Sequence, residues 1–268
     1  MFKKCPFLIT LILGMTFQIC FAENVTLNSS LRTGDGQQLI LPAILKKPNG
    51  KGPFPAVVLL AGCSGEAFNS IRESTWADRL VNWGYVTMQP DSWNPRNDSG
   101  VCTQSQYYRI PEMAIVRAQD AFDAKAFLVI QPYIDPNRIA FMGWSHGGWT
   151  VLKALRTELT YKNSKGPFNA GIAFYPYCTK PLDKLNAPLM ILHGEKDTWT
   201  PAYTCTAEMP SGETEHEVVH HIYPDAYHDF DWPGLDETYE GQRLVYNPAA
   251  TKMAIEHVRG FLEKYLQK

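Results

Sequence analysis

Short apolar runs recur along the chain from about residue 38 and alternate with segments in which apolar residues follow helical spacing. The run at 56–60, AVVLL, has no polar position, which is typical of a strand buried on both faces of a parallel sheet. Strands are also expected at 39–45, 86–88, 138–142, 170–174, 189–192 and 217–223. Helices are expected at 76–83, 111–129, 149–158 and 249–266. Strands that alternate with helices predict an α/β protein with a mostly parallel, doubly wound sheet flanked by helices.

Turn residues separate these elements without marking a domain boundary. Gly84 is placed to end the first helix, and the 19 glycines and 19 prolines are spread along the chain without forming a linker. With 45% hydrophobic residues, the segment 23–268 is expected to be one domain around a large core. The polar segment 92–109 is expected to be an irregular surface loop over the site.

The first 22 residues have the pattern of a secretory signal peptide. Lys3 and Lys4 precede an apolar run at 7–19, and cleavage is expected after the small residue Ala22. A membrane anchor is the alternative, but the run is shorter than the roughly 20 apolar residues of a spanning helix. A lipid-modified Cys20 is a further alternative, although small residues do not precede it. The pattern favours an exported protein, periplasmic or extracellular, with no stable membrane anchor after cleavage.

Cysteine usage agrees with export. The cysteines outside the signal peptide are Cys63, Cys102, Cys178 and Cys205. An even number in an oxidising compartment favours disulfides, and we expect the pairs Cys63–Cys102 and Cys178–Cys205, because each joins loops expected near one end of the sheet. Four buried free thiols are the alternative. A zinc site is not favoured, because no CxxC or HExxH spacing is present.

The charge balance bears on the class of partner. The formal net charge is −2, from 25 basic and 27 acidic residues, and no basic cluster stands out. A nucleic-acid partner is therefore not expected.

The chemistry is expected where strands end, because open parallel sheets carry their sites in the loops that follow the carboxyl ends of strands. The strand at 138–142 leads into 143–148, GWSHGG, which matches G-x-S-x-G. On a strained turn between a strand and a helix, a serine projects its hydroxyl clear of the backbone, and the glycines let neighbouring elements approach. An ordinary glycine-rich turn is the alternative, but the position between a buried strand and a helix favours Ser145 as a nucleophile.

A serine nucleophile needs a histidine to take its proton and a carboxylate to orient that histidine. In chains with this turn, the acid follows the serine and the histidine comes last. Asp197 comes just after the strand at 189–192, and Gly194 permits a turn that lets its side chain reach back. Glu195 is the competing acid, whereas Asp183 precedes the strand.

His228 lies on the loop after the last strand and is the expected general base. The other histidines have alternative roles. His193 is expected to be a structural hydrogen-bonding residue, and His146 is expected to contribute its backbone N–H. Surface or packing positions are expected for His216, His220 and His221, and His257 on the closing helix is expected to be solvated.

Acyl transfer also needs donors for the oxyanion, commonly the N–H after the nucleophile and one from the loop after an early strand. Here these donors are predicted to be the backbone N–H groups of His146 and Cys63. Gly62 and Gly65 leave room for a carbonyl to approach the loop AGCSG at 61–65. The alternative is that this loop is merely a turn.

Taken together, the motifs AGCSG at 61–65, GWSHGG at 143–148, HGEKD at 193–197 and AYHDF at 226–230 resemble the dienelactone hydrolase family of α/β hydrolases. The resemblance covers nearly the whole chain after the signal peptide. It implies a single-domain α/β-hydrolase fold that hydrolyses a small-molecule ester or lactone without a metal or organic cofactor. The founding members use cysteine as nucleophile and are cytoplasmic, whereas this chain has Ser145 and an export signal. These differences favour a general carboxylesterase over an enzyme for dienelactone itself.

Aromatic residues are frequent beside the predicted site. They are either the lining of an aromatic acyl pocket or part of the core: Trp93, Trp144, Trp149, Tyr175, Tyr177 and Trp199.

Two other functions stay open. One is a peptidase or acyltransferase on the same fold, and the other is a non-catalytic binding protein that keeps the fold. The intact set of Ser145, Asp197 and His228 argues against the binding protein.

Overall fold

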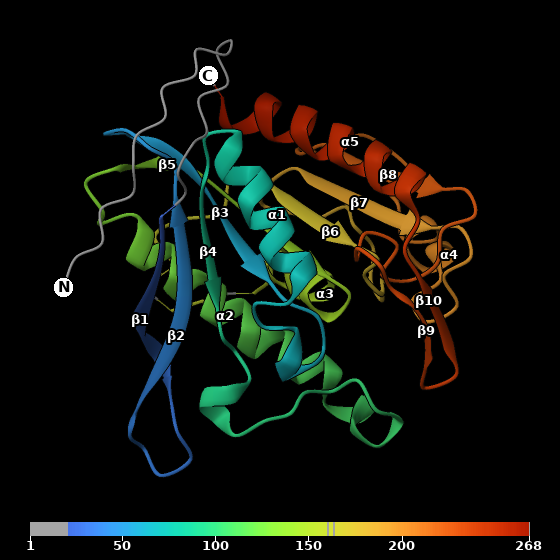
Figure 1. Ribbon diagram of the computed structural model, residues 1–268, viewed down its shortest axis with the longest axis horizontal. Coiled ribbons are helices and arrows are strands. Elements are labelled where there is room, and N and C mark those ends of the chain that lie inside the picture. The colour runs from blue at the N-terminus through green and yellow to red at the C-terminus, as the bar shows by residue number, and fades with distance from the viewer. Residues whose placement is uncertain (1–20, 160, 163, 268) are drawn as a thin grey trace, which may run out of the picture.

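The computed structural model describes residues 21–159, 161–162 and 164–267 (Figure 1). The predicted signal peptide lies outside the described residues except at 21–22, so its cleavage stays a prediction. The main sheet has eight strands in the order β1-β2-β4-β3-β5-β6-β7-β8. These strands are β1 Phe21–Arg32, β2 Gln38–Lys47, β3 Phe54–Leu60, β4 Val86–Pro90, β5 Ile134–Trp144, β6 Gly171–Phe174, β7 Leu189–Gly194 and β8 Val218–Tyr223.

The sheet is mostly parallel, which confirms the predicted fold class. Strands β1 and β2 pair antiparallel, and β2 is antiparallel to β4. From β4 to β8 every neighbouring pair is parallel, so the carboxyl ends of these strands meet at one edge. Loops that are far apart in the chain are therefore brought together at that edge.

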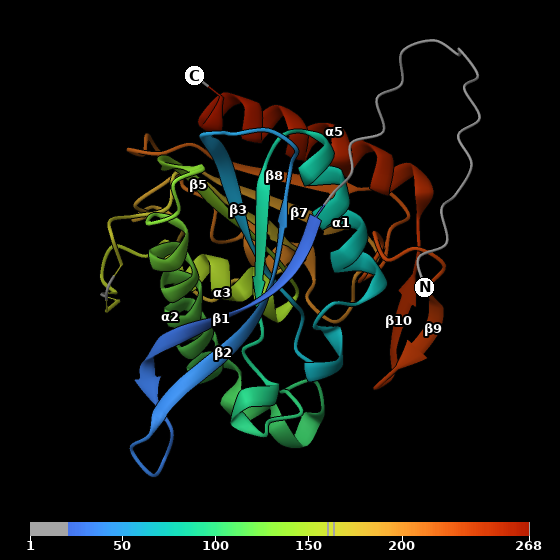
Figure 2. The ribbon, with the colours of Figure 1, turned by 60° about the vertical axis from the view of Figure 1, so that its left-hand side comes forward.

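Helices cover both faces of the sheet, as Figures 1 and 2 show from two directions. Helices α2 and α3 lie on one face, and α1 and α5 lie on the other, while the short α4 follows β7. Their bounds are α1 Ile71–Asn82, α2 Ile110–Leu128, α3 His146–Ala154, α4 Ala202–Thr206 and α5 Pro248–Leu266. The polar segment at 92–109 holds two short 3-10 helices, Asn94–Arg96 and Gln104–Arg109, and the loop after β3 holds another at Gly65–Ala67.

The central strand β3 explains why its sequence run is uniformly apolar. Val58 and Leu60 pack into the core beneath α2 and α3, whereas Val57 and Leu59 pack into the core beneath α1 and α5. Successive side chains of a strand point to opposite faces, so a strand covered on both sides needs apolar residues at every position. In β2, by contrast, buried and exposed positions alternate, because only one of its faces is covered.

Several parts of the fold differ from the sequence expectation, including α4, which was not predicted, and α1, which begins at Ile71 and not at 76. Strand β1 was not predicted, because it lies at the sheet edge and few of its residues are buried. The hairpin β9 Asp236–Tyr239 and β10 Gln242–Val245 was also missed, since its side chains are mostly exposed. The segment 92–109 is more ordered than an irregular loop, because an Arg96–Asp120 ion pair ties it to α2.

Both predicted disulfides are present. Cys63 and Cys102 join the loop after β3 to the segment 92–109, with Cα atoms 5.1 Å apart. Cys178 and Cys205 join the loop after β6 to α4, with Cα atoms 4.8 Å apart. Each cross-link restrains a loop at the edge of the sheet where the strands end.

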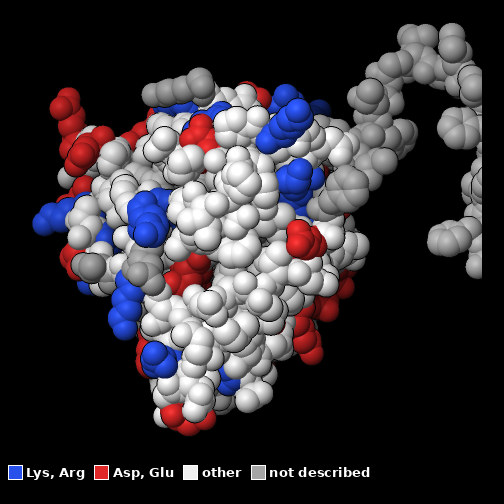
Figure 3. All heavy atoms as spheres, turned by 90° about the vertical axis from the view of Figure 1, so that its left-hand side faces the viewer, with Lys and Arg blue, Asp and Glu red and all other residues white. Residues whose placement is uncertain are grey.

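The face on the side of β1 and β2 shows Lys, Arg, Asp and Glu around a broad area of uncharged residues, without a field of one sign (Figure 3). Within the described part of the chain, no helix is both long and apolar enough to cross a membrane.

Candidate active site

Ser145 occupies the sharp turn between β5 and α3. Its backbone has φ 52° and ψ −114°, a conformation that residues other than glycine rarely adopt. The turn is held at both sides, because Ser145 N donates to Phe174 O at 2.9 Å and Trp149 N donates to Ser145 O at 2.9 Å. The strained backbone is therefore fixed by β6 and by the first turn of α3.

The glycines of GWSHGG are required by close backbone approach. A Cβ on Gly147 would lie 2.0 Å from Leu60 O, and a Cβ on Gly143 would lie 2.3 Å from Gly147 O. Helix α3 thus starts directly against the end of β3. The predicted reason for these glycines, room for neighbouring elements, is confirmed by these distances.

Asp197 and His228 form a buried pair. The Nδ1 of His228 lies 2.8 Å from Oδ2 of Asp197, and the two residues are 2% and 4% exposed. The Asp197 carboxylate also accepts from Trp199 N, Thr200 N and Thr200 Oγ1, each at 2.9 Å. These bonds fix the carboxylate, which in turn orients the imidazole.

Asp197 and His228 shift each other's pKa so that each favours the charged form of the other. Burial alone would lower the pKa of His228, but the charge of Asp197 and the hydrogen bond to it outweigh burial and raise that pKa above its ordinary value. Burial would raise the pKa of Asp197, but His228 and the N–H of Thr200 lower it below its ordinary value. Both shifts favour the state in which Asp197 is ionised and His228 can hold a proton.

The competing acids are placed elsewhere. Glu195 is exposed, and its carboxylate accepts from Asp225 N at 3.2 Å in a surface turn. Asp183 is exposed before β7 begins. Asp197 is therefore the acid that the fold places against His228.

Ser145 and His228 line one cavity of about 290 Å³, together with Cys63. The loop carrying Cys63 is held by backbone contacts: Cys63 O accepts from Val101 N at 2.8 Å, and a Cβ on Gly100 would lie 2.0 Å from that oxygen. The fold thus brings the loop after β3, the turn after β5 and the loop after β8 to one place.

Arg117 is a site residue that the sequence analysis missed. It lies on α2, is 2% exposed, and stacks with its guanidinium carbon 4.7 Å from the Trp93 ring. Its Nη2 donates to Ala61 O at 2.5 Å, and its Nη1 donates to Gly62 O at 3.1 Å. An arginine among the apolar positions of a predicted helix was the available signal, because a buried charge needs partners.

The His146 side chain is held by the same arginine. Its Nδ1 lies 2.6 Å from Nη1 of Arg117, and its Nε2 lies 3.0 Å from Ile110 O. Burial and the neighbouring guanidinium lower the pKa of His146 to about 3. The ring is therefore neutral at pH 7, with Nε2 donating to the carbonyl and Nδ1 accepting from Arg117. Arg117 thereby connects the loop after β3 with the residue that follows Ser145.

A buried network lies behind the His228 loop. The Asp231 carboxylate accepts from Trp76 Nε1 at 2.7 Å, Trp144 Nε1 at 2.8 Å and Tyr175 Oη at 2.6 Å. Arg72 donates to Tyr175 Oη at 3.1 Å. Every strong donor here is satisfied by a partner, so the network fixes the backbone that follows His228.

The network reaches His228 through Tyr175. The Tyr175 ring lies 4.5 Å from the His228 ring, centroid to centroid. Arg72 is paired with Glu73 at 2.6 Å and also with Asp229, the neighbour of His228. The His228 imidazole is thus held by the Tyr175 ring packed against it as well as by its hydrogen bond to Asp197.

The remaining histidines play structural parts. The Nε2 of His193 lies 2.9 Å from Pro176 O and its Nδ1 lies 2.9 Å from His220 Nε2, which agrees with the predicted structural role. The expectation that His257 is solvated was wrong: it is half-buried, because its ring stacks on His221 with centroids 3.8 Å apart and its Nδ1 lies 2.9 Å from Tyr223 Oη.

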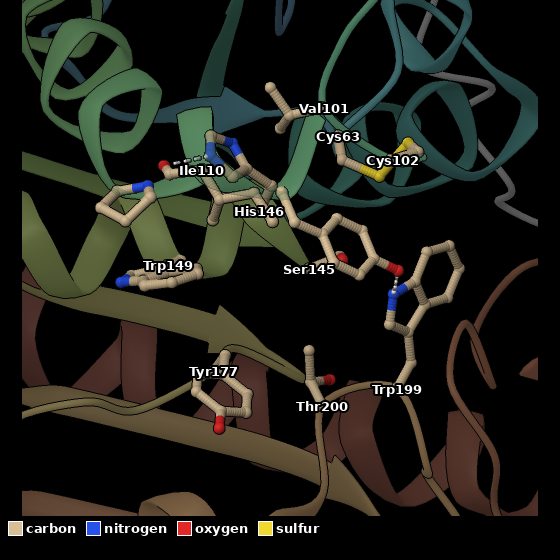
Figure 4. Close-up of a pocket in the computed structure, with 12 residues that line it drawn as sticks. Cys63, Val101, Cys102, Ile110, Ser145, His146, Trp149, Tyr177, Trp199 and Thr200 are labelled. Atoms are coloured by element: carbon tan, nitrogen blue, oxygen red, sulfur yellow. Dashed lines mark hydrogen bonds between the residues drawn. A yellow bond between two sulfur atoms is a disulfide. The ribbon is translucent and has the colours of Figure 1, made fainter. Parts of the chain in front are cut away.

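The aromatic residues divide into two groups. Trp93, Trp144 and Tyr175 are buried in the core or in the networks above, whereas Trp149, Tyr177 and Trp199 line a cavity beside Ser145 (Figure 4). Both alternatives left open by the sequence thus apply, each to different residues.

In the described ranges, no group of three or more His, Cys, Asp or Glu side chains is arranged to hold a metal ion.

Comparison with known proteins gives a consistent assignment. Residues 41–266 match the model of the Dienelactone hydrolase family. A Synechocystis protein named as a carboxymethylenebutenolidase is 25% identical over 91% of this chain and 99% of its own length. A Metarhizium robertsii protein named as dipeptidyl-aminopeptidase B is 30% identical, but over only 35% of this chain and 9% of that protein. A solved Klebsiella pneumoniae structure named as a dienelactone hydrolase has a TM-score of 0.66 at 19% identity and covers 92% of this chain and 100% of that one.

Proposed function

Because the chain belongs to the dienelactone hydrolase family, whose members hydrolyse carboxylic esters, we propose that it cleaves esters or lactones through an acyl-enzyme on Ser145. The observation that carries this proposal is the buried hydrogen bond between Asp197 and His228, because His228 lines the cavity that Ser145 also lines. A strained serine, a matched imidazole and an ionised carboxylate are the parts that acyl transfer needs.

In the proposed reaction, His228 takes the proton of the Ser145 hydroxyl while its oxygen attacks the ester carbonyl. Asp197 stabilises the imidazolium that forms. The backbone N–H groups of Cys63 and His146 are the proposed donors to the oxyanion. The imidazolium then gives its proton to the leaving alcohol as the carbon–oxygen bond breaks. Water, deprotonated by His228, attacks the acyl-enzyme carbonyl. The bond to the Ser145 oxygen then breaks as His228 returns the proton to that oxygen, which releases the acid and restores Ser145.

A peptidase or acyltransferase activity is the second candidate. The similarity to dipeptidyl-aminopeptidase B supports only a shared segment, because it spans 35% of this chain. Matched ester and amide substrates with the same acyl group test this. We expect ester cleavage to be faster than amide cleavage, and a faster amide reaction would favour the peptidase.

A binding protein without activity is the third candidate. The φ of 52° at Ser145 argues against it, since a binding protein gains nothing from holding a serine in a strained conformation. Backbone strain of this kind is typically retained where function requires it.

We also propose that the chain is exported and that residues 1–22 are removed. The two disulfides support this, because such bonds persist in oxidising compartments. N-terminal sequencing of the mature protein should find residue 23 or a close neighbour first, and a chain that still begins at Met1 would reject the cleavage.

The direct test is intact-mass labelling with a fluorophosphonate, which needs no assumption about the substrate. The unaltered protein should gain one adduct, and Ser145→Ala should gain none. Ser64→Ala is the matched control, because Ser64 lines the same cavity and should keep the adduct. No adduct on a folded protein would leave the binding protein as the better function.

A further inference from the structure

Ser145 lies between two cavities with different linings. One cavity, of about 260 Å³, is drawn in Figure 4, and we call it the aromatic cavity. The other, of about 290 Å³, we call the polar cavity. Ser145, Trp199 and the Cys63–Cys102 disulfide line both, so a substrate bonded at Ser145 has room on two sides.

The aromatic cavity has no charged side chain in its described lining. Trp149, Tyr177 and Tyr107 provide rings, and Val101 and Ile110 provide aliphatic surface. In Figure 4 the side chains of Trp149, Tyr177 and Ile110 lie around an open space beside Ser145. The Trp199 indole Nε1 donates to the Tyr107 hydroxyl at 3.2 Å, and both residues line the cavity. An aromatic ring bound there would contact other rings, and these contacts stabilise it beyond the burial of its apolar area. A carboxylate bound there would lose its water without gaining a cation as partner, which is unfavourable.

The polar cavity is acidic. Glu66 and Glu237 line it and are exposed, and Asp229 lines it beside Arg72. The charge of Arg72 is already matched by Glu73 and Asp229. A hydroxyl or a cation suits this lining, whereas an anion would meet uncompensated carboxylates.

His228 decides which part of a substrate lies in which cavity. It lines the polar cavity, but it is not among the residues of the aromatic one. The imidazolium must deliver its proton to the leaving oxygen, so the leaving alcohol has to lie on the side of His228. The acyl group then extends from the Ser145 oxygen toward the aromatic cavity.

We propose that the substrates are esters of an aryl or arylalkyl carboxylic acid with a hydrophilic alcohol that carries no negative charge. This inference rests on the acyl-enzyme mechanism proposed above. The aromatic acyl group occupies the aromatic cavity against the rings of Trp149 and Tyr177, and the alcohol lies toward Glu66 and Glu237.

The test uses two isomeric esters of similar leaving-group reactivity, methyl phenylacetate and benzyl acetate. They contain the same atoms, but the ring is on the acyl side in the first and on the alcohol side in the second. With each rate divided by its hydroxide-catalysed rate, kcat/KM should favour methyl phenylacetate by about ten-fold, from burial of one ring. Equal values, or a preference for benzyl acetate, would overturn the inference.

Two tyrosine variants locate the effect. Tyr177 lines the aromatic cavity and is 37% exposed, and Tyr239 lines the polar cavity and is 40% exposed, so both tolerate truncation. Tyr177→Ala should reduce the preference by about three-fold or more, because part of the ring's surroundings is lost. Tyr239→Ala should not reduce the preference, because Tyr239 lies on the alcohol side of Ser145. The opposite pattern would place the acyl group in the polar cavity.

The alcohol side has its own comparison. The kcat/KM for the 2-hydroxyethyl ester of phenylacetic acid should exceed the kcat/KM for the carboxymethyl ester. Glu237→Gln should reduce the ratio of these two kcat/KM values by about three- to five-fold, which corresponds to the loss of one exposed charge. Because the ratio is compared between variants, intrinsic reactivity cancels. A ratio unaffected by Glu237→Gln and by Glu66→Gln would reject the alcohol assignment.

Fluorophosphonate labelling separates this inference from the proposed function. If Ser145 is labelled but methyl phenylacetate is not preferred, or neither isomer is cleaved, the proposed substrate class is wrong. The proposed serine-hydrolase function then still stands. Absence of the adduct on folded protein rejects both.

Discussion

The Nδ1 of His228 lies 2.8 Å from Oδ2 of Asp197, and this contact joins two loops that follow different strands. Asp197 comes after β7 and His228 comes after β8, which are parallel neighbours in the sheet. The sheet therefore places the two side chains together, and Tyr175 and Trp199 pack on the imidazole with ring centroids 4.5 and 5.1 Å away.

The first prediction concerns pH. The pKa of His228 is raised above its ordinary value of 6.5, because Asp197 outweighs the effect of burial. The base must be neutral to take a proton, so kcat/KM should fall as the pH drops through that raised pKa. Its acidic limb should have a midpoint above pH 6.5. Asp197→Asn removes the carboxylate charge, so the midpoint should move to lower pH and kcat should fall by about 10³- to 10⁴-fold. A midpoint that stays in place would mean that another group controls the limb.

The same shift affects stability. A histidine whose pKa is raised by folding stabilises the protein fully below its unfolded pKa, and this contribution is lost as the pH rises through the folded pKa. Between those two values, His228→Gln should therefore lose its destabilising effect progressively with rising pH, measured by urea unfolding at several pH values. A constant difference would indicate that packing, not charge, dominates.

The second prediction concerns the strain at Ser145. Ser145→Ala should lower kcat by about 10⁴- to 10⁶-fold while keeping the fold. Ser145→Gly should be equally inactive but more stable than the alanine variant, by about 1 kcal/mol, because glycine tolerates a φ of 52°. Denaturant unfolding of both variants measures this. Equal stability would show that the turn is not strained.

The third prediction compares two glycines. Gly147→Ala places a Cβ 2.0 Å from Leu60 O, so α3 or β3 must move, and the free energy of unfolding should fall by about 3 kcal/mol or more. Gly260→Ala is the control, because no atom outside the adjacent helical backbone lies within 4 Å of its Cβ position in α5. That variant should gain about 0.5–1 kcal/mol from helix propensity. Similar effects at both positions would contradict the packing of α3 against β3.

The fourth prediction concerns the disulfides. Replacing both cysteines of either bond by serine should cost about 2–4 kcal/mol of unfolding free energy. The Cys63–Cys102 variant should also lose activity, because this bond lines both cavities beside Ser145. The Cys178–Cys205 variant should keep most of its activity, since Cys178 and Cys205 line neither cavity. Activity lost equally in both would point to a general loss of folding.

The fifth prediction concerns Arg117. Arg117→Met removes the Arg117 donor from Ala61 O and one of the two side-chain donors of Gly62 O, which keeps Trp93 Nε1, and should cost about 2–4 kcal/mol. If Arg117 positions the proposed oxyanion donors, kcat should fall more than KM changes. Arg117→Lys should recover part of the stability but little of kcat, because one ammonium cannot reproduce the forked contacts. An unchanged kcat in a folded Arg117→Met variant would leave Arg117 a purely structural role.

The sequence alone was sufficient for features set by local sterics and by the period of apolar residues. The continuous run of β3 predicted a strand covered on both sides, and the alternation of strands and helices predicted a mostly parallel sheet. The glycines around Ser145 predicted a tight turn, because only a residue without Cβ tolerates such contacts. Loop positions relative to this sheet also predicted the proximity of Asp197 and His228 and both cysteine pairs.

Only the tertiary structure decided features whose partners come from distant segments. Strand β1 and the hairpin β9–β10 bury few side chains, so they leave a weak periodic signal. Arg117 lies among the apolar positions of its helix, but the spacing along the helix does not show that the carbonyls of the loop after β3 accept its hydrogen bonds. Likewise, the aromatic residues look alike in sequence, yet Trp144 is buried against Asp231 while Trp149 faces a cavity. A side chain's environment depends on what packs against it across the sheet, and residue spacing along one segment does not contain that information.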